Sequence, residues 1–234
     1  MNMLQEKLNN LLDKYDVNSN IQIVDCQNAV VDGKKIRLLP WRSERRFIEL
    51  KKMVESGAIN GLSTMRITHI TRKGADLFDI LFREADICET IMGSAITEIF
   101  AVANGQTALN AIAKNAEGCV CTFELAATLN DGAEPIDKHE IIACSGIACD
   151  RVVDTQVPQS SVYVLGEKTE RYTDVDMELF GLDMGQCAAV RSCFELAKTG
   201  EDNEKNISHL NRVVEAAKRS IAETENVILQ EAAM

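Results

Sequence analysis

Between residues 95 and 167 the sequence is a run of short strand-like segments, with helical patterns on both sides. The segments are rich in Val, Ile, Thr and Phe, and turn residues such as NDGAEP separate them. A run of strands flanked by helices is typical of an α+β domain. We therefore predict a mostly antiparallel open sheet with helices packed on one face.

The individual elements follow from hydrophobic periodicity. Helices are predicted at residues 2–15, 43–54, 77–93, 183–198 and 206–225. Strands are predicted at residues 20–25, 34–41, 62–71, 95–103, 119–129, 139–146, 148–155 and 160–167. Asp32-Gly33 marks a turn, and residues 108–118 are expected to be a short helix or an irregular loop.

The chain has 234 residues and a net charge of −11, from 25 basic and 36 acidic residues. This balance disfavours a general nucleic-acid binder, which needs a basic face. No apolar run approaches the roughly 20 residues of a membrane span, and the N-terminus does not resemble a signal peptide. We expect a cytoplasmic protein with no nucleic-acid or membrane partner.

The eight cysteines and three histidines do not form a zinc pattern. We expect the cysteines to be small buried residues in a reducing compartment, and we predict no metal site. The sequence also has no GxGxxG, P-loop, GxSxG or HExxH motif. Short motifs alone therefore predict no catalytic activity for this chain.

The segment RKGADLFDILFREADICETIMG, residues 72–93, combines helical periodicity with many charges. Asp79, Arg83 and Asp86 are spaced four and three residues apart, so they can lie near one helix face. Glu84 is expected to face elsewhere. This helix is therefore the first place to look for a site.

From residue 36 onward, the chain resembles the C-terminal domain of the Gfo/Idh/MocA oxidoreductases. The resemblance is carried by four segments in the family's order, and it spans about 190 residues. They are WRSERRFIELKKMVESGAINGLSTMRI, ADLFDILFREADICETIMGSAITEIFAV, HEIIACSGIACDRVV and the closing helix pair CFELAKTGED…HLNRVVEAAKRSIAETENVIL. The resemblance implies that the chain has two parts. Residues 1–35 form an N-terminal helix and strand extension, and residues 36–234 form an α+β domain like that of the family.

The resemblance implies a domain that supplies a sugar or polyol pocket and oligomerises through its sheet, beside an N-terminal Rossmann domain that binds NAD or NADP. This sequence departs from the pattern, because the Rossmann domain and its Glu-Lys-Pro tripeptide are absent. Arg83 stands where the family has its catalytic histidine, and Leu81 replaces a glycine. The segment that links the strand at 65–71 to the helix is also shorter than usual.

Arginine does not exchange protons near neutral pH, but it can hold a carboxylate or phosphate. Arg83 is therefore a candidate for substrate binding with Asp86 and Arg66, or it simply pairs with carboxylates of its own helix. Asp79 and His69 are the candidate catalytic residues, His69 because it could replace the missing imidazole.

Three functions remain open from the sequence. The first is a free-standing, non-catalytic or accessory subunit that forms homo-oligomers through its sheet or pairs with a Rossmann-bearing subunit. The second is the sugar-binding subunit of a two-chain dehydrogenase, with NAD(P) held by the partner and no cofactor bound by this chain alone. The third is a binding module for a sugar acid or a phosphate. A cofactor-free isomerase or lyase is a weaker possibility.

Overall fold

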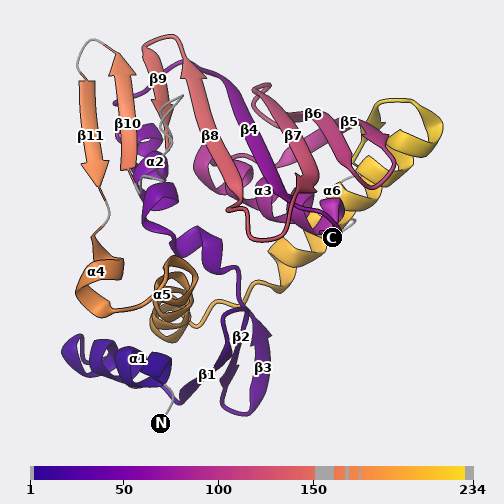
Figure 1. Ribbon diagram of the computed structural model, residues 1–234. Helices are drawn as coiled ribbons and strands as arrows, with labels where there is room; N and C mark the ends of the chain where they lie inside the picture. Colours follow the sequence, from indigo (N-terminus) through magenta and orange to yellow (C-terminus); the bar gives the residue numbers. More distant parts are fainter. Residues whose placement is uncertain (1–2, 151–160, 167–168, 174, 230–234) are drawn as a thin grey trace. The chain divides into compact units, whose positions relative to one another are not determined.

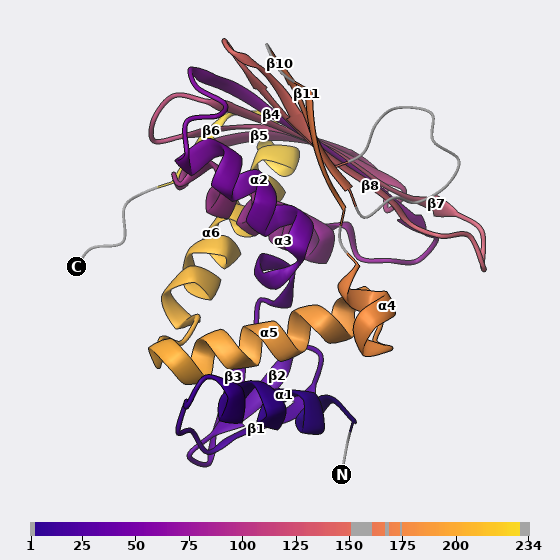
Figure 2. The same cartoon turned by 90° about the vertical axis from the view of Figure 1, so that its left-hand side faces the viewer.

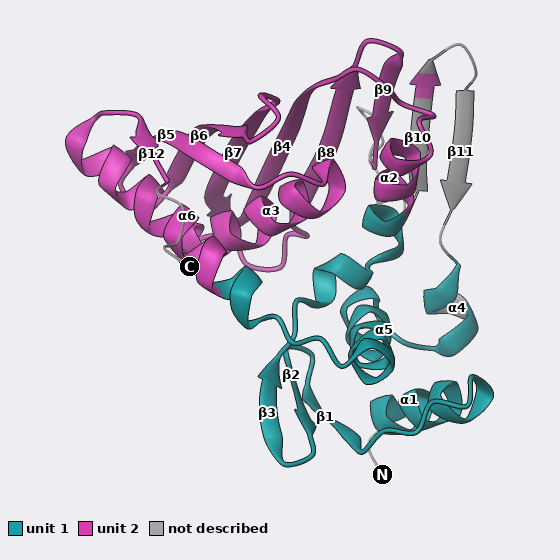
Figure 3. Cartoon of the chain, turned by 180° about the vertical axis from the view of Figure 1, so that it is seen from behind, with its two compact units in different colours: residues 1–48, 174–207 teal, residues 49–173, 208–234 magenta. Residues whose placement is uncertain are grey.

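The computed structural model describes residues 3–150, 161–166, 169–173 and 175–229 (Figure 1). Its helices and strands confirm the predicted α+β class. Contacts group the chain into unit 1, residues 1–48 and 174–207, and unit 2, residues 49–173 and 208–234 (Figure 3). Two of the three boundaries between the units fall inside helices, α2 (Arg45–Glu55) and α6 (Glu204–Glu223), and the third falls between residues 173 and 174. The predicted division after residue 35 stays a prediction.

Unit 1 contains helices and a small antiparallel sheet of order β1-β2-β3. Its further elements are α1 (Met3–Lys14), β1 (Ile21–Asp25), β2 (Asn28–Val31), β3 (Lys34–Arg37), the 3-10 helix η1 (Pro40–Ser43), α4 (Asp176–Phe180) and α5 (Met184–Thr199). Strand β2 was not predicted. The Asp-Gly turn joins β2 to β3, and Asp32 and Gly33 have φ of +49° and +82°, which suits a tight hairpin.

The core of unit 1 explains why its N-terminal helix forms. The leucines of α1 recur on one face, and Leu4, Leu8 and Leu12 are buried. They belong to one apolar cluster with residues of α5 and of the small sheet, which include Cys187, Val190, Cys193, Leu196, Ile21 and Ile23. Because an isolated helix of this length is marginal in water, this burial is what stabilises α1.

Unit 2 is built on a nine-stranded sheet of order β11-β10-β9-β8-β4-β7-β6-β5-β12. The strands are β4 (Leu62–Arg72), β5 (Ile96–Asn104), β6 (Ala108–Asn115), β7 (Val120–Leu129), β8 (Ile136–Ala143), β9 (Gly146–Cys149), β10 (Ser161–Gly166), β11 (Thr169–Thr173) and β12 (Val227–Ile228). All neighbouring pairs are antiparallel except β4 and β7, which are parallel. The sheet is therefore mostly antiparallel, as predicted.

Helix α3 (Leu77–Met92) and helix α6 lie on one face of this sheet (Figure 2). No described helix of unit 2 covers the opposite face, which we call the open face. Strand alternation assigns the side chains to these faces. On β4, Met65 and Ile67 are buried toward the helices, whereas Arg66 is exposed on the open face.

The segment 108–118 is the main difference from the sequence prediction, because β6 occupies residues that were expected to be a helix or a loop. Leu109, Ala111 and Ala113 are buried, and the residues between them are exposed. Pairing with β5 on one side and β7 on the other overrides the weak helical preference of this segment. The predicted strand at 148–155 is strand through Cys149, and residues 151–155 lie outside the described residues. Among the described helices, none is long and apolar enough to cross a bilayer.

Candidate functional site

Helix α3 carries the candidate site, and both of its ends are fixed by local chemistry. Its N-cap residue is Asp76, whose carboxylate accepts a hydrogen bond of 2.8 Å from the backbone N–H of Phe78. At the other end Gly93 adopts a left-handed conformation with φ of +68°. The middle of the helix is deeply buried, and Glu84 has no exposed surface at all.

A buried histidine of β8 lies between two carboxylates. The Nε2 atom of His139 is 2.7 Å from Glu84 Oε2, and its Nδ1 atom is 2.7 Å from Asp150 Oδ2. Asp150 also accepts a hydrogen bond of 2.7 Å from the backbone N–H of His139. His139 and Glu84 are fully buried, and Asp150 nearly so.

This arrangement fixes the charges of its members. Both ring nitrogens of His139 must carry protons to donate to two carboxylates, so the ring is an imidazolium. Burial alone would favour the neutral ring, but Asp150 and Glu84 overcome this and raise the pKa of His139 to about 9. Burial likewise works against the Glu84 carboxylate, but Arg83 and His139 outweigh it and lower the pKa of Glu84 well below its usual value.

A second histidine uses the other oxygen of the same carboxylate. His69 lies on β4, and its Nδ1 atom is 2.7 Å from Glu84 Oε1. Because Glu84 is ionised, it accepts a hydrogen bond from Nδ1–H of His69, and Nε2 is the ring nitrogen that this carboxylate does not contact. Its side chain is 13% exposed, and no described residue hydrogen-bonds to Nε2. A histidine oriented by a carboxylate in this way is suited to accept a proton.

Arg83 completes the cluster, which is formed by Glu84, His69, His139, Asp150, Arg83 and Asp137. Its guanidinium contacts Glu84 and lies 3.5 Å from Asp137 Oδ2. Asp137 and His69 are direct neighbours in the pairing of β8 with β4. Arg83 thus stands where the family's histidine was expected, and it is already bound to carboxylates of its own unit.

The other predicted site residues have different surroundings. Asp79 is exposed on the first turns of α3 and makes no ion pair with any described residue. Asp86 is fully buried farther along the helix. Arg66 points to the open face of the sheet, where its Nη1 atom is 3.4 Å from Glu140 Oε2. Of the five predicted residues, His69 and Arg83 meet within the cluster.

The sequence reasoning missed the centre of the cluster. Glu84 was expected to face away from the site, but it joins both histidines. His139 and Asp137 occupy alternate positions of a strand whose next inward residue is Ile141, so two polar residues at inward positions were the available signal. The described residues include no group of His, Cys, Asp or Glu side chains placed to hold a metal ion.

The cysteines agree with the prediction in most positions. All eight are free, and six of them are buried, whereas Cys144 is exposed. In the core of unit 2, the sulfur atoms of Cys88 and Cys121 are 2.9 Å apart. They fill the space between α3 and β7 as small apolar side chains.

Comparison with known proteins gives a likeness in structure but not in sequence. No protein-family model matches the chain, and no curated protein matches it. Solved dehydrogenase structures do match. A probable dehydrogenase from Thermotoga maritima aligns with a TM-score of 0.60 and 20% identity, over 81% of this chain and 63% of that one. The chain has the Gfo/Idh/MocA C-terminal fold.

Two further structures support this assignment of fold. A putative myo-inositol dehydrogenase from Sinorhizobium meliloti 1021 aligns with a TM-score of 0.62 and 16% identity, over 83% of this chain and 65% of that one. A levoglucosan dehydrogenase in complex with NADH and L-sorbose aligns with a TM-score of 0.65 and 13% identity, over 83% and 65%. The chain thus spans less than two thirds of the length of these three structures.

Proposed function

We propose that this chain is an accessory subunit of the oxidoreductase type, which performs no proton transfer at residue 83 and assembles through the open face of its sheet. The observation that supports this most is the state of Arg83. A guanidinium stays protonated under all ordinary conditions, and this one is bound to Glu84 and Asp137. Arg83 stands at the position where the family that the sequence resembles has a proton-transferring histidine, and here its side chain forms ion pairs instead.

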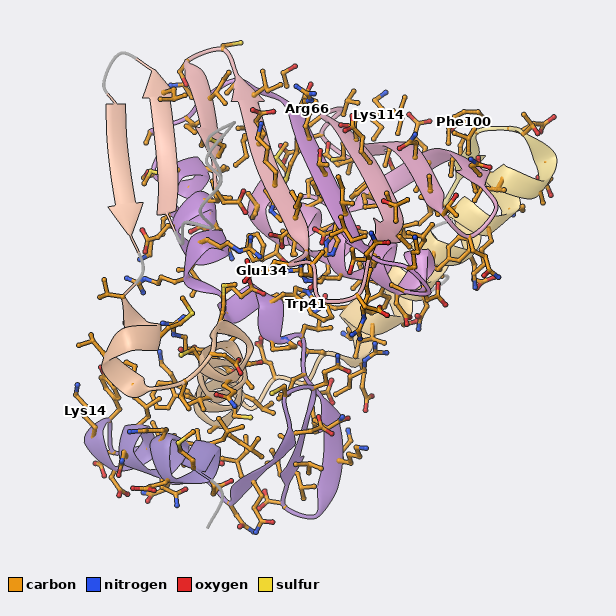
Figure 4. All side chains as sticks on the ribbon, in the orientation of Figure 1. Lys14, Trp41, Arg66, Phe100, Lys114 and Glu134 are labelled. Carbon is orange, nitrogen blue, oxygen red and sulfur yellow. The ribbon has the colours of Figure 1, made fainter. Side chains whose placement is uncertain are left out.

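The composition of the open face supports assembly. One cross-strand row reads Phe100, Ile112, Thr122, Arg66 and Glu140 from β5 to β8. Ile112 is 56% exposed and Val102, on the same face, is 47% exposed. Figure 4 shows Phe100, Lys114 and Arg66 together on this face. Apolar side chains mixed with charges of both signs suit a self-complementary interface in a homo-oligomer.

The mass of the chain in solution tests the assembly. We expect light scattering after size-exclusion chromatography to give an oligomer for the wild type and a smaller species for Ile112→Glu. Leu179→Glu is the matched control, because Leu179 is 70% exposed and lies in unit 1 rather than on the sheet. A monomeric wild type, or equal effects of both variants, would contradict assembly through the open face.

Cofactor binding tests the accessory role. Unit 1 begins with a helix and a small antiparallel sheet, and the described residues contain no Gly-rich strand-turn-helix that could receive a dinucleotide pyrophosphate. We expect titration of this chain alone with NADH to give no saturable change in fluorescence. Tight binding of NADH would sink the proposal that NAD(P) comes from a partner chain.

A second candidate function is favoured by the pair of His69 and Glu84. In a two-chain dehydrogenase, a Rossmann-bearing partner would hold NAD(P), and this chain would bind a sugar or polyol with His69 Nε2 as the proton acceptor. His69→Gln should then lower the rate of the assembled pair by about 100-fold or more, the usual range for general base catalysis. Lys198→Gln, at an exposed residue of unit 1, is the control. Equal rates for wild type and His69→Gln would rule out this role.

The third candidate, a module for a sugar acid or a phosphate at Arg83, finds less support in these contacts. An incoming anion would have to compete with the two carboxylates that Arg83 already contacts. One of them, Glu84, is fully buried and would lose its guanidinium partner, although both histidines would remain. We therefore place this candidate behind the other two.

A further inference from the structure

Unit 1 contains a cavity of about 400 Å³ that none of the functions above uses. It lies between α1, α4 and α5, and every residue that lines it belongs to unit 1. Its floor is apolar, because Leu182, Cys187 and Val190 are part of the buried core. Cavities of this size are typical of sites for small organic ligands.

Two aromatic residues border the cavity. Phe180, at the end of α4, is 48% exposed, and Tyr15, just after α1, is 57% exposed. Large aromatic side chains that stay half in water beside an apolar floor leave a surface that a flat apolar group can cover. The apolar part of the cavity thus continues from the buried core to the solvent.

The charges at the rim are mostly positive. Lys7 and Lys14 lie seven residues apart on α1, two turns along the same side, and both line the cavity. Neither makes an ion pair with any described residue, and Lys14 Nζ lies 5.4 Å from the ring centre of Tyr15. The one acidic residue of the lining, Asp176, is already paired with Arg191.

We propose that this cavity binds a small organic acid with a flat apolar body. The carboxylate faces Lys7 and Lys14, and the body lies on the apolar floor between Tyr15 and Phe180. A chain with a net charge of −11 repels anions in general, so two lysines without carboxylate partners beside an apolar cavity mark a local exception. This site is independent of the proposed function, because it uses no residue of the sheet or of α3.

A matched series of naphthalene compounds tests the site. Naphthalene-1-acetate, naphthalene-1-ethanol and naphthalene-1-ethylamine share one apolar body and differ in charge. Isothermal titration at low ionic strength should show one site for the acid, about tenfold weaker binding of the alcohol, and weaker binding still of the amine. Equal affinity for acid and alcohol, or no binding of the acid, would overturn the proposal.

Variants locate the binding in the cavity. The double variant Lys7→Gln/Lys14→Gln should lower the affinity for the acid about tenfold and leave that for the alcohol unchanged. Phe180→Ser should weaken the binding of all three compounds. Because Phe180 is 48% exposed, we expect the variant to fold, and a melting curve checks this. Lys198→Gln, on an exposed turn of α5 outside the cavity, is the control and should change nothing. An unaltered affinity in the double variant would also overturn the proposal.

Discussion

Strands β4 and β8 place ionisable side chains on both faces of the large sheet, and the two faces hold them very differently. On the helix-covered face, His139 and Glu84 are fully buried and 2.7 Å apart. On the open face, Arg66 is 53% exposed and lies 3.4 Å from Glu140. The same two strands thus contribute to one largely buried ion network and carry a second, more exposed ion pair that water screens.

The difference teaches which charges define this molecule. A buried charge that loses its partner is not solvated by water, so removing the partner destabilises the fold strongly. An exposed pair loses little, because each member is solvated without the other. The helix-side cluster therefore fixes protonation states and orientations, whereas the open-face charges are free to meet another surface. Substitutions on the two faces should separate these roles.

Removing the shared carboxylate should have the largest effect. Glu84→Gln leaves the imidazolium of His139 with one carboxylate partner, and we expect the free energy of unfolding to fall by about 3–5 kcal/mol. Glu140→Gln on the open face is the matched control, with an expected loss below about 1 kcal/mol. Urea denaturation measures both. Losses of similar size would show that burial does not separate the two faces.

The pH dependence of stability should come next in size. The folded pKa of His139, about 9, lies above its ordinary value of 6.5. Its contribution to stability is therefore complete below pH 6.5 and is lost as the pH rises through 9. A difference of this size corresponds to about 3 kcal/mol. Because the pKa of Glu84 is lowered, its ionised side chain contributes stability above the ordinary pKa of a glutamate. This stability is lost as the pH falls toward acid values. His139→Gln should flatten the alkaline loss, and an unchanged slope would contradict this assignment.

Arg83→Gln should have an intermediate effect of about 2 kcal/mol, the range for a hydrogen bond to a charged group. The loss is smaller than for Glu84 because the guanidinium is 20% exposed and Glu84 keeps both histidines. Thermal unfolding at pH 7 measures it. A loss as large as that of Glu84→Gln would mean that Arg83, not His139, is the main partner of the carboxylate.

The smallest effect should come from the open face. Arg66→Gln removes an exposed ion pair, and we expect a change in stability below about 1 kcal/mol that shrinks further at high salt. The same melting curves, recorded at low and high salt, measure it. A loss of stability that is equally large at high salt would contradict this, because it would show that water and ions do not screen the pair of Arg66 and Glu140.

The sequence predicted most of the fold because its signals are local. The periodicity of α3 can be read directly, and the structure agrees. Strand β6 could not be predicted, because its inward residues Leu109, Ala111 and Ala113 do not by themselves favour a strand. Pairing with β5 and β7 decides its conformation. The site was harder still. His139 and Glu84 are 55 residues apart in sequence, and only the packing of α3 on the large sheet brings them together.

The central claim is that His139 is a buried imidazolium that holds Glu84 ionised, so that the neighbouring His69 keeps its proton on Nδ1. Long-range ¹H–¹⁵N spectra of the histidine rings at pH 7.5 test this most directly. We predict two protonated nitrogens for His139 and a proton on Nδ1 of His69; His139→Gln assigns the signals. A neutral His139 ring at this pH would contradict the account.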